Sequence, residues 1–121
     1  MAPGRELDLL VAEKIFKHPL APHPFTGEIF IKYGEGYALS QIPEYSTDIA
    51  EAWQVVEKIK EFKVYDWMQV PLTIAVYSDG CHVGWVDDSM DDFANWHHEV
   101  TADTAPHAIC LAALKAYGVE F

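Results

Sequence analysis

Residues 72–87 constrain the fold more than any other stretch of this sequence. Two runs rich in β-branched and aromatic residues flank the Asp-Gly pair at positions 79–80, which favours a two-residue hairpin turn because both central residues need positive φ. An isolated hairpin is marginal in water, so further strands and helical cover are expected to complete the fold. With Asp79 and Gly80 as the loop, the predicted cross-strand pairs are Val76–Val83 and Ile74–Trp85 on one face, and Tyr77–His82, Ala75–Gly84 and Thr73–Val86 on the other.

Two segments before the hairpin have the apolar spacing of amphipathic helices. Residues 5–16 alternate apolar and charged side chains at helical spacing and stop before Pro19, since the position ahead of a proline disfavours helix. Residues 45–62 begin with capping oxygens, and Asp48 followed by Glu51 resembles a capping box. We expect this second helix to pack on a sheet through one apolar stripe, which consists of Ile49, Ala52, Trp53, Val56 and Ile59.

The last predicted helix, over residues 104–117, is apolar on nearly all sides. Thr104 can cap it, Pro106 falls in its first turn, and Gly118 suits a left-handed residue after its end. A helix of this kind is buried on more than one side. It is therefore either overlain by the first helix or the N-terminal segment, or it forms a homo-oligomer interface through residues 105–117.

Short strands are predicted on both sides of the hairpin. Residues 28–33 and 36–39, joined by Gly34-Glu35, follow a proline-rich loop. Residues 96–100 would add a third strand to the hairpin sheet, with Trp96, His98 and Val100 on one face and His97 and Glu99 on the other. The order of elements predicts a single α+β domain over residues 1–121, with three main helices against a mostly antiparallel sheet.

The charge balance excludes some classes of partner. The net charge is −11, from 8 basic and 19 acidic residues, and direct nucleic-acid binding is not expected because phosphate contacts need Lys and Arg. An acidic surface does permit a DNA mimic or a basic partner. No run approaches the ~18 apolar residues of a membrane span, and Cys81 and Cys110 lack CxxC spacing. We therefore expect a cytoplasmic protein that contacts no membrane and carries buried thiols in place of a disulfide.

No catalytic or metal-binding constellation stands out. The acidic residues at 87–92 lack both the glycine and the glutamate that a calcium loop needs, so a solvated loop is favoured. His97 and His98, as neighbours on a strand, would point to opposite faces and could not readily share one ion. Ser46 is explained by capping and Cys81 by packing, because neither has a nucleophile signature around it. No catalytic residue, metal or cofactor is predicted.

The start of the second helix is a candidate ligand site. Free N–H groups make a helix start an anion site, and Tyr45 with Trp53 could stack on a base, although Asp48 supplies a competing carboxylate. An aromatic-lined pocket could also form near the hairpin sheet. The candidate ligand-binding residues are Tyr45, Ser46, Thr47 and Trp96.

Three blocks together resemble one known family: LDLLVAEKIF (7–16), YSTDIAEAWQVVEKIK (45–60) and ADTAPHAICLAALKAYG (102–118). The chain resembles the phage ABA sandwich domain, although Phe16-Lys17-His18 stands where that family has a glycine and a tryptophan. The resemblance implies α/β/α sandwich-like layering, a phage or prophage origin and no established enzymatic function. Our hypothesis is a non-enzymatic accessory protein of the bacterial host cell that binds a host or phage macromolecule. The alternatives are a protein that sequesters a small nucleotide or metabolite to counter host signalling, and an acidic DNA-mimic inhibitor.

Overall fold

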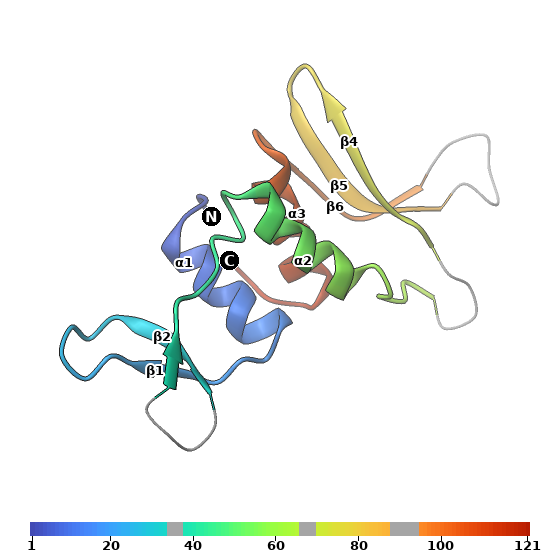
Figure 1. The fold of residues 1–121 in the computed structure, drawn as a ribbon. Helices are drawn as coiled ribbons and strands as arrows, with labels where there is room; N and C mark the ends of the chain where they lie inside the picture. Colours follow the sequence, from blue (N-terminus) through green and yellow to red (C-terminus); the bar gives the residue numbers. More distant parts are fainter. Residues whose placement is uncertain (34–37, 66–69, 88–94) are drawn as a thin grey trace.

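The computed structural model describes residues 1–33, 38–65, 70–87 and 95–121. In these residues the chain forms three helices and two antiparallel sheets, with strand orders β1-β2-β3 and β4-β5-β6. The helices lie between the two sheets (Figure 1). The predicted α+β class, with three main helices and antiparallel pairing, is confirmed. None of the described helices is long and apolar enough to cross a membrane.

All three predicted helices are present. Helix α1 (Arg5–Leu10) continues as a π-helical segment, Val11–Ile15, in which the Phe16 N–H donates to the Val11 carbonyl at 3.2 Å. Helix α2 spans Ile49–Ile59 and helix α3 spans Ala105–Ala116. Both α1 and the Val11–Ile15 segment contact α3.

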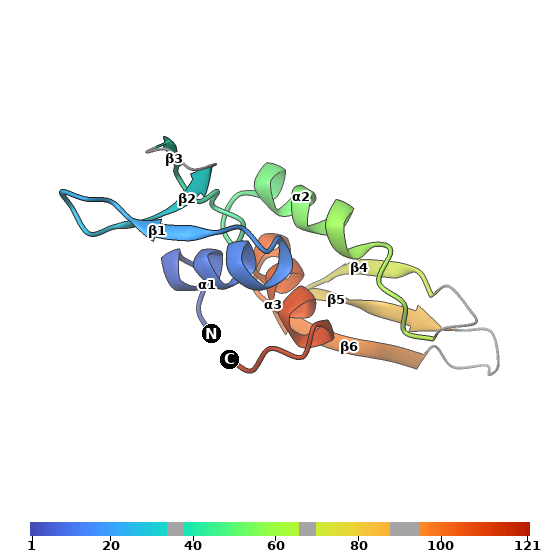
Figure 2. The same ribbon diagram turned by 90° about the horizontal axis from the view of Figure 1, so that it is seen from below.

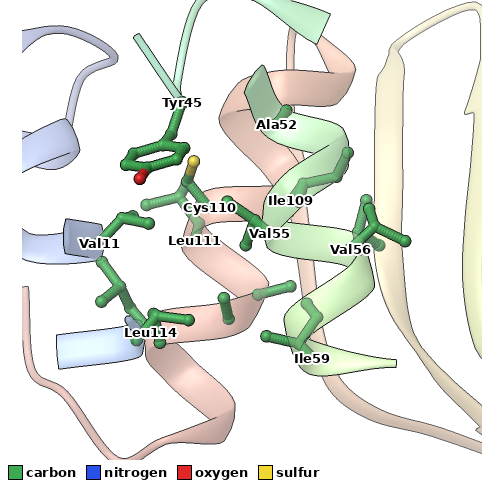
Figure 3. Close-up of a cluster of buried hydrophobic side chains, with 14 of the residues drawn as sticks. Val11, Tyr45, Ala52, Val55, Val56, Ile59, Ile109, Cys110, Leu111 and Leu114 are labelled. Atoms are coloured by element: carbon green, nitrogen blue, oxygen red, sulfur yellow. The ribbon is translucent and has the colours of Figure 1, made fainter. Parts of the chain in front are cut away.

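Helix α3 is the centre of the hydrophobic core. One side of it packs against β5 and β6, and other sides contact α2 and the Val11–Ile15 segment. The expectation that the first helix overlies α3 is confirmed, and burial within one chain accounts for its apolar surface. Each large side chain in this core contributes roughly 1.5–3 kcal/mol through burial. The side chains labelled in Figure 3 are Val11, Tyr45, Ala52, Val55, Val56, Ile59, Ile109, Cys110, Leu111 and Leu114.

The predicted core stripe of α2 is wrong at two positions. Trp53 is 52% exposed and Ile49 is 56% exposed, whereas Val55, which the stripe omitted, is fully buried. The cause is the packing partner, because α2 packs mainly against α3 and not against a sheet. A cylindrical neighbour covers a narrower strip of a helix than a flat sheet does, so the rim of the stripe stays in solvent.

The predicted hairpin forms, but its register is wrong by two residues. Strand β4 (Leu72–Tyr77) pairs with β5 (Gly80–Asp87) through Ser78 and Asp79 as the loop, so that Ile74 faces Val83. A shift of two preserves the side of the sheet that each side chain faces. Gly80 is required for the close approach of β5 to β6 and not for the loop. Its φ is +133°, and an added Cβ would lie 2.5 Å from the Ala102 carbonyl oxygen on β6.

Strand β6 (Asn95–Ala102) confirms the predicted third strand but carries a β-bulge. Two residues of β6 lie opposite Gly84, and one of them, His98, has a positive φ of 55°. A bulge reverses the alternation of side chains beyond it. His97 therefore pairs with Trp85, and the predicted separation of His97 from His98 onto opposite faces is wrong.

The N-terminal sheet consists of β1 (Leu20–Pro22), β2 (Ile29–Tyr33) and β3 (Ala38–Ser40). The last two match the predicted strands, while the Gly34-Glu35 connection lies outside the described residues. Strand β1 falls in the segment predicted to be a proline-rich loop. It forms because an edge strand tolerates proline, whose missing N–H can face away from the ladder.

Candidate functional site

Ser46, predicted as a cap and as a ligand-binding residue, is a buried tie between two segments. Its N–H donates to Asp8 Oδ1 at 2.8 Å, and its Oγ accepts from the Gly4 N–H at 2.8 Å. Its hydroxyl also lies 3.3 Å from the Gly4 carbonyl oxygen, to which it can donate. The serine thus fastens the start of α1 to the segment before α2, and the prediction that it caps a helix is wrong.

Asp48 is the cap of α2. Its Oδ1 accepts from the N–H groups of Ala50 at 2.8 Å and Glu51 at 3.3 Å. The Glu51 carboxylate accepts from Gln54 Nε2 at 2.7 Å, and the Asp48 N–H donates to the Glu44 carbonyl, so the predicted reciprocal box is not formed. With a carboxylate already on its free N–H groups, this helix start repels an anionic ligand.

The remaining predicted ligand-binding residues lie on different surfaces. Tyr45 is 1% exposed and stacks on Phe16 with ring centroids 5.1 Å apart, so it belongs to the core. Thr47 is exposed. Trp96 lies on β6, on the face of the sheet turned away from α3, where its ring covers Gly84. The structure brings Tyr45 and Ser46 together in the interior and places Trp96 on another element.

A polar hollow of about 540 Å³ lies beside the start of α2. Arg5 lines it, with its Nη2 donating to the Ile29 carbonyl at 2.7 Å. Three carboxylates line the hollow together with this one guanidinium, so the hollow is negative and does not suit a phosphate. Its other lining residues are Gln41, Ile42, Pro43, Glu44, Asp48 and Glu51.

An open groove of about 400 Å³ lies between α1 and the N-terminal sheet. Figure 2 shows α1 running alongside β1. Most of its lining is apolar, and two carboxylates, Glu6 and Glu13, flank it. Glu13 Oε1 already pairs with Lys14 Nζ at 3.2 Å in an exposed ion pair. The apolar lining residues are Met1, Leu9, Leu10, Leu20 and Ile29.

Sequence reasoning missed this groove. The usable signal was Leu9, which lies off the buried stripe of α1 and so gives the helix a second apolar side. The other wall comes from β1, which the prolines concealed.

His82 forms a polar cluster on the open face of the β4-β5-β6 sheet. Its Nδ1 lies 3.1 Å from Glu99 Oε1 and 3.5 Å from Thr101 Oγ1, and its ring lies 4.6 Å from that of Tyr77. The predicted contact with Tyr77 is confirmed, although it is diagonal and not directly opposite. His82 Nε2 lies 3.6 Å from Asp79 Oδ1 in the turn, so the ring of this β5 residue contacts the turn as well as β4 and β6. The cluster therefore holds the strands together.

His97 and His98 lie in an aromatic cluster at the bulge. His97 Nε2 is 3.3 Å from the Tyr65 hydroxyl, and the His98 ring packs edge-on against Phe62 and Trp85 at 5.5 Å and 5.9 Å. Burial lowers the pKa of His98, and the charges of His97 and Lys115 lower it further. Within the described ranges, no three His, Cys, Asp or Glu side chains converge to hold a metal ion. Of the acidic stretch at 87–92, Asp87 is buried and the rest lies outside the described residues.

Both cysteines are buried free thiols, as predicted. Burial, assisted by the negative charge of Asp8, raises the pKa of Cys110 far above its usual range. Cys110 is therefore a packed side chain and not a nucleophile.

Comparisons with known proteins agree with this geometry. The chain is similar to a crystal structure of a phage protein from Bacillus cereus ATCC 14579, with 28% sequence identity and a TM-score of 0.62. The match covers 96% of this chain and 92% of that one. No curated protein matches the chain. The sequence profile of the phage ABA sandwich domain matches residues 9–114, which include the end of α1, all of α2 and all but the end of α3. The chain belongs to the phage ABA sandwich domain family.

Proposed function

We propose that this protein is a non-enzymatic phage accessory protein that acts by holding a segment of another protein in the groove between α1 and β1–β2. The observation that carries this proposal is the lining of the groove, in which five apolar side chains meet two carboxylates. Apolar recesses with a few placed charges are the usual form of a binding site. A segment with leucine-like side chains flanked by lysine or arginine would match both features.

The charge of the whole chain supports the same class of partner. A net charge of −11 attracts basic molecules over a distance of about one Debye length and raises their rate of encounter. The sequestration of a nucleotide is less well supported, because the hollow beside the predicted ligand residues carries three carboxylates. The two side chains considered as nucleophiles in the sequence are Ser46, which is engaged in a buried hydrogen-bond tie, and Cys81, which is buried in the core.

The proposal can be tested with designed peptides. One peptide carries an amphipathic leucine-rich segment flanked by lysines, and its matched control has glutamates in their place. We expect the basic peptide alone to bind, to shift the methyl resonances of Leu9 and Leu10, and to weaken as salt is added.

Charge reversal supplies the specific variant. Glu6→Lys combined with Glu13→Lys should reduce the affinity about tenfold or more, since both rim charges then repel the peptide. Glu57→Lys combined with Glu61→Lys, at two exposed positions, changes the net charge by the same amount and should leave the affinity unchanged. Equal binding of the basic and acidic peptides, or no methyl shift with either, would contradict the proposal.

A further inference from the structure

Strand β4 is an edge strand without the usual protection against pairing. Among the residues that the structure describes, the two sheets have four edges, formed by β1, β3, β4 and β6. Strands β1 and β3 have three residues each, and β1 contains Pro22. Strand β6 is bulged, and its Glu99 carbonyl accepts from Lys115 Nζ at 2.8 Å. Short length, proline, bulges and lysine are the devices by which edges avoid pairing. Strand β4 is six residues, LTIAVY, with no charge, proline or bulge.

The hydrogen-bonding groups on this free edge can be identified. The Val86 N–H donates to the Pro71 carbonyl at 3.1 Å, which makes Pro71 and Val86 a hydrogen-bonded pair. In an antiparallel ladder, hydrogen-bonded and non-bonded pairs alternate. Residues 73, 75 and 77 therefore bond toward β5, and the N–H and C=O groups of the residues between them point outward. Those residues are Leu72, Ile74 and Val76.

We propose that β4 pairs antiparallel with the β4 of a second copy of this chain, about a two-fold axis centred on Ile74. Ile74 then lies opposite itself, and Leu72 lies opposite Val76 in both directions. Each of these pairs can exchange two hydrogen bonds, so every outward group of the strand finds a partner. Moving the centre by one residue leaves either Leu72 or Val76 without a partner in the other strand. This surface is separate from the groove and does not depend on it.

Side chains and charge favour a second copy as the occupant. Val76 and Tyr77 are 76% and 54% exposed, although both are large and apolar. In the proposed register Val76 lies beside Leu72 of the other copy, and Tyr77 lies opposite its Pro71, so both gain an apolar neighbour. Two chains of net charge −11 repel each other least when they meet through surfaces without carboxylates, and β4 contains none. A basic partner would gain nothing from this uncharged strand.

Sedimentation velocity over a range of concentrations tests the pairing in solution. The wild type is expected to shift from 13.7 kDa toward twice that mass, and to do so at lower concentration when salt is added, because screening weakens the repulsion. Val76→Pro is the informative variant, since its N–H points outward and the proline removes no bond within the chain. Val76→Thr keeps both the N–H and the β-branch and is the matched control. We expect Val76→Thr to dimerise and Val76→Pro to remain monomeric with the circular dichroism spectrum of the wild type.

Amide hydrogen exchange on the wild type provides a test that needs no variant. The amides of Leu72, Ile74 and Val76 should exchange slowly at high protein concentration and quickly at low concentration. A wild type that stays monomeric at about 1 mM, well above the Kd of a specific dimer, overturns the proposal. A dimer in which these three amides exchange quickly at every concentration also overturns it, because the copies would then meet through another surface.

Discussion

Removal of the Asp8 carboxylate should destabilise the protein strongly, although Asp8 lies far from Ser46 in sequence. Asp8 is 4% exposed, and Ser46, whose backbone N–H donates to the Asp8 carboxylate, is 0% exposed. A hydrogen bond to a charged group contributes about 1.5–3 kcal/mol, and its removal here leaves a buried N–H unpaired. We therefore expect Asp8→Ala to lower the free energy of unfolding by about 2–3 kcal/mol.

Two further variants separate the parts of this tie. Asp8→Asn keeps an oxygen acceptor for the Ser46 N–H and removes the charge, so a loss of only about 1 kcal/mol is expected. Ser46→Ala leaves the backbone donor in place and removes the acceptor of the Gly4 N–H, which should also lower stability by about 1 kcal/mol. Asp103→Ala, at an exposed position, is the control and should stay within about 0.5 kcal/mol of the wild type.

Urea denaturation followed by fluorescence and circular dichroism gives the required values. The midpoints should shift while the denaturant slopes stay the same, because the same surface is exposed on unfolding. If Asp8→Ala unfolds at the same urea concentration as Asp103→Ala, the tie does not contribute to stability. If Asp8→Asn is as damaging as Asp8→Ala, the charge matters and the acceptor geometry does not.

Three other substitutions test the core, the turn and the bulge. Trp85→Ala should lower the free energy of unfolding by about 3–5 kcal/mol and Trp53→Ala by less than about 1 kcal/mol in urea titrations, and equal losses would contradict the assignment of the core. Gly80→Ala should lower the melting temperature by at least about 10 °C, because its Cβ would meet the Ala102 carbonyl; a shift under about 2 °C would contradict this close approach. His98 has a lowered pKa in the fold, so the unfolded chain takes up its proton first and stability falls as the pH drops through the usual value of 6.5. In His98→Asn the asparagine tolerates the positive φ, and the urea midpoint should fall less than that of the wild type between about pH 7 and about pH 5. An identical fall in the two proteins would refute the role of His98.

The sequence predicted the helices well because their signals are local. Asp48 was correctly predicted to cap α2, and the all-round apolar composition of α3 predicted its central position. The exposure of Trp53 could not be read from periodicity, because the width of a buried stripe depends on whether a helix or a sheet covers it. The role of Ser46 was equally hidden, since its partners, Gly4 and Asp8, are distant in sequence.

The errors in the sheet have a common physical cause in two glycines. Gly80 was predicted to be a loop residue and Gly84 to be the partner of Ala75, but at each of these glycines the backbone of β6 comes close to β5. An added Cβ at Gly84 would lie 3.0 Å from the His97 carbonyl oxygen and 3.1 Å from the Glu99 Cα. This close approach determines where β6 is bulged, and the bulge in turn determines which face of the sheet His97 and Trp96 occupy. A glycine in a strand indicates a close approach but does not name the residue that approaches.

The groove and the β4 edge together lead to one more prediction. Figure 1 shows the two sheets at opposite ends of the molecule with the helices between them, so a dimer formed through β4 would carry its two grooves at its far ends. Such a dimer can hold two basic segments on one surface at once, and linked binding can raise apparent affinity by about 10²–10⁴ without any new contact. On a sensor densely coated with the lysine-flanked peptide, the wild type should dissociate far more slowly than Val76→Pro. In solution, with free peptide, the two proteins should bind with the same Kd, because the groove itself is unchanged. Slow dissociation of the wild type from the coated sensor, together with an equal Kd in solution, requires both the β4 edge and the groove. Equal dissociation of the two proteins from the coated sensor would show that the grooves act singly.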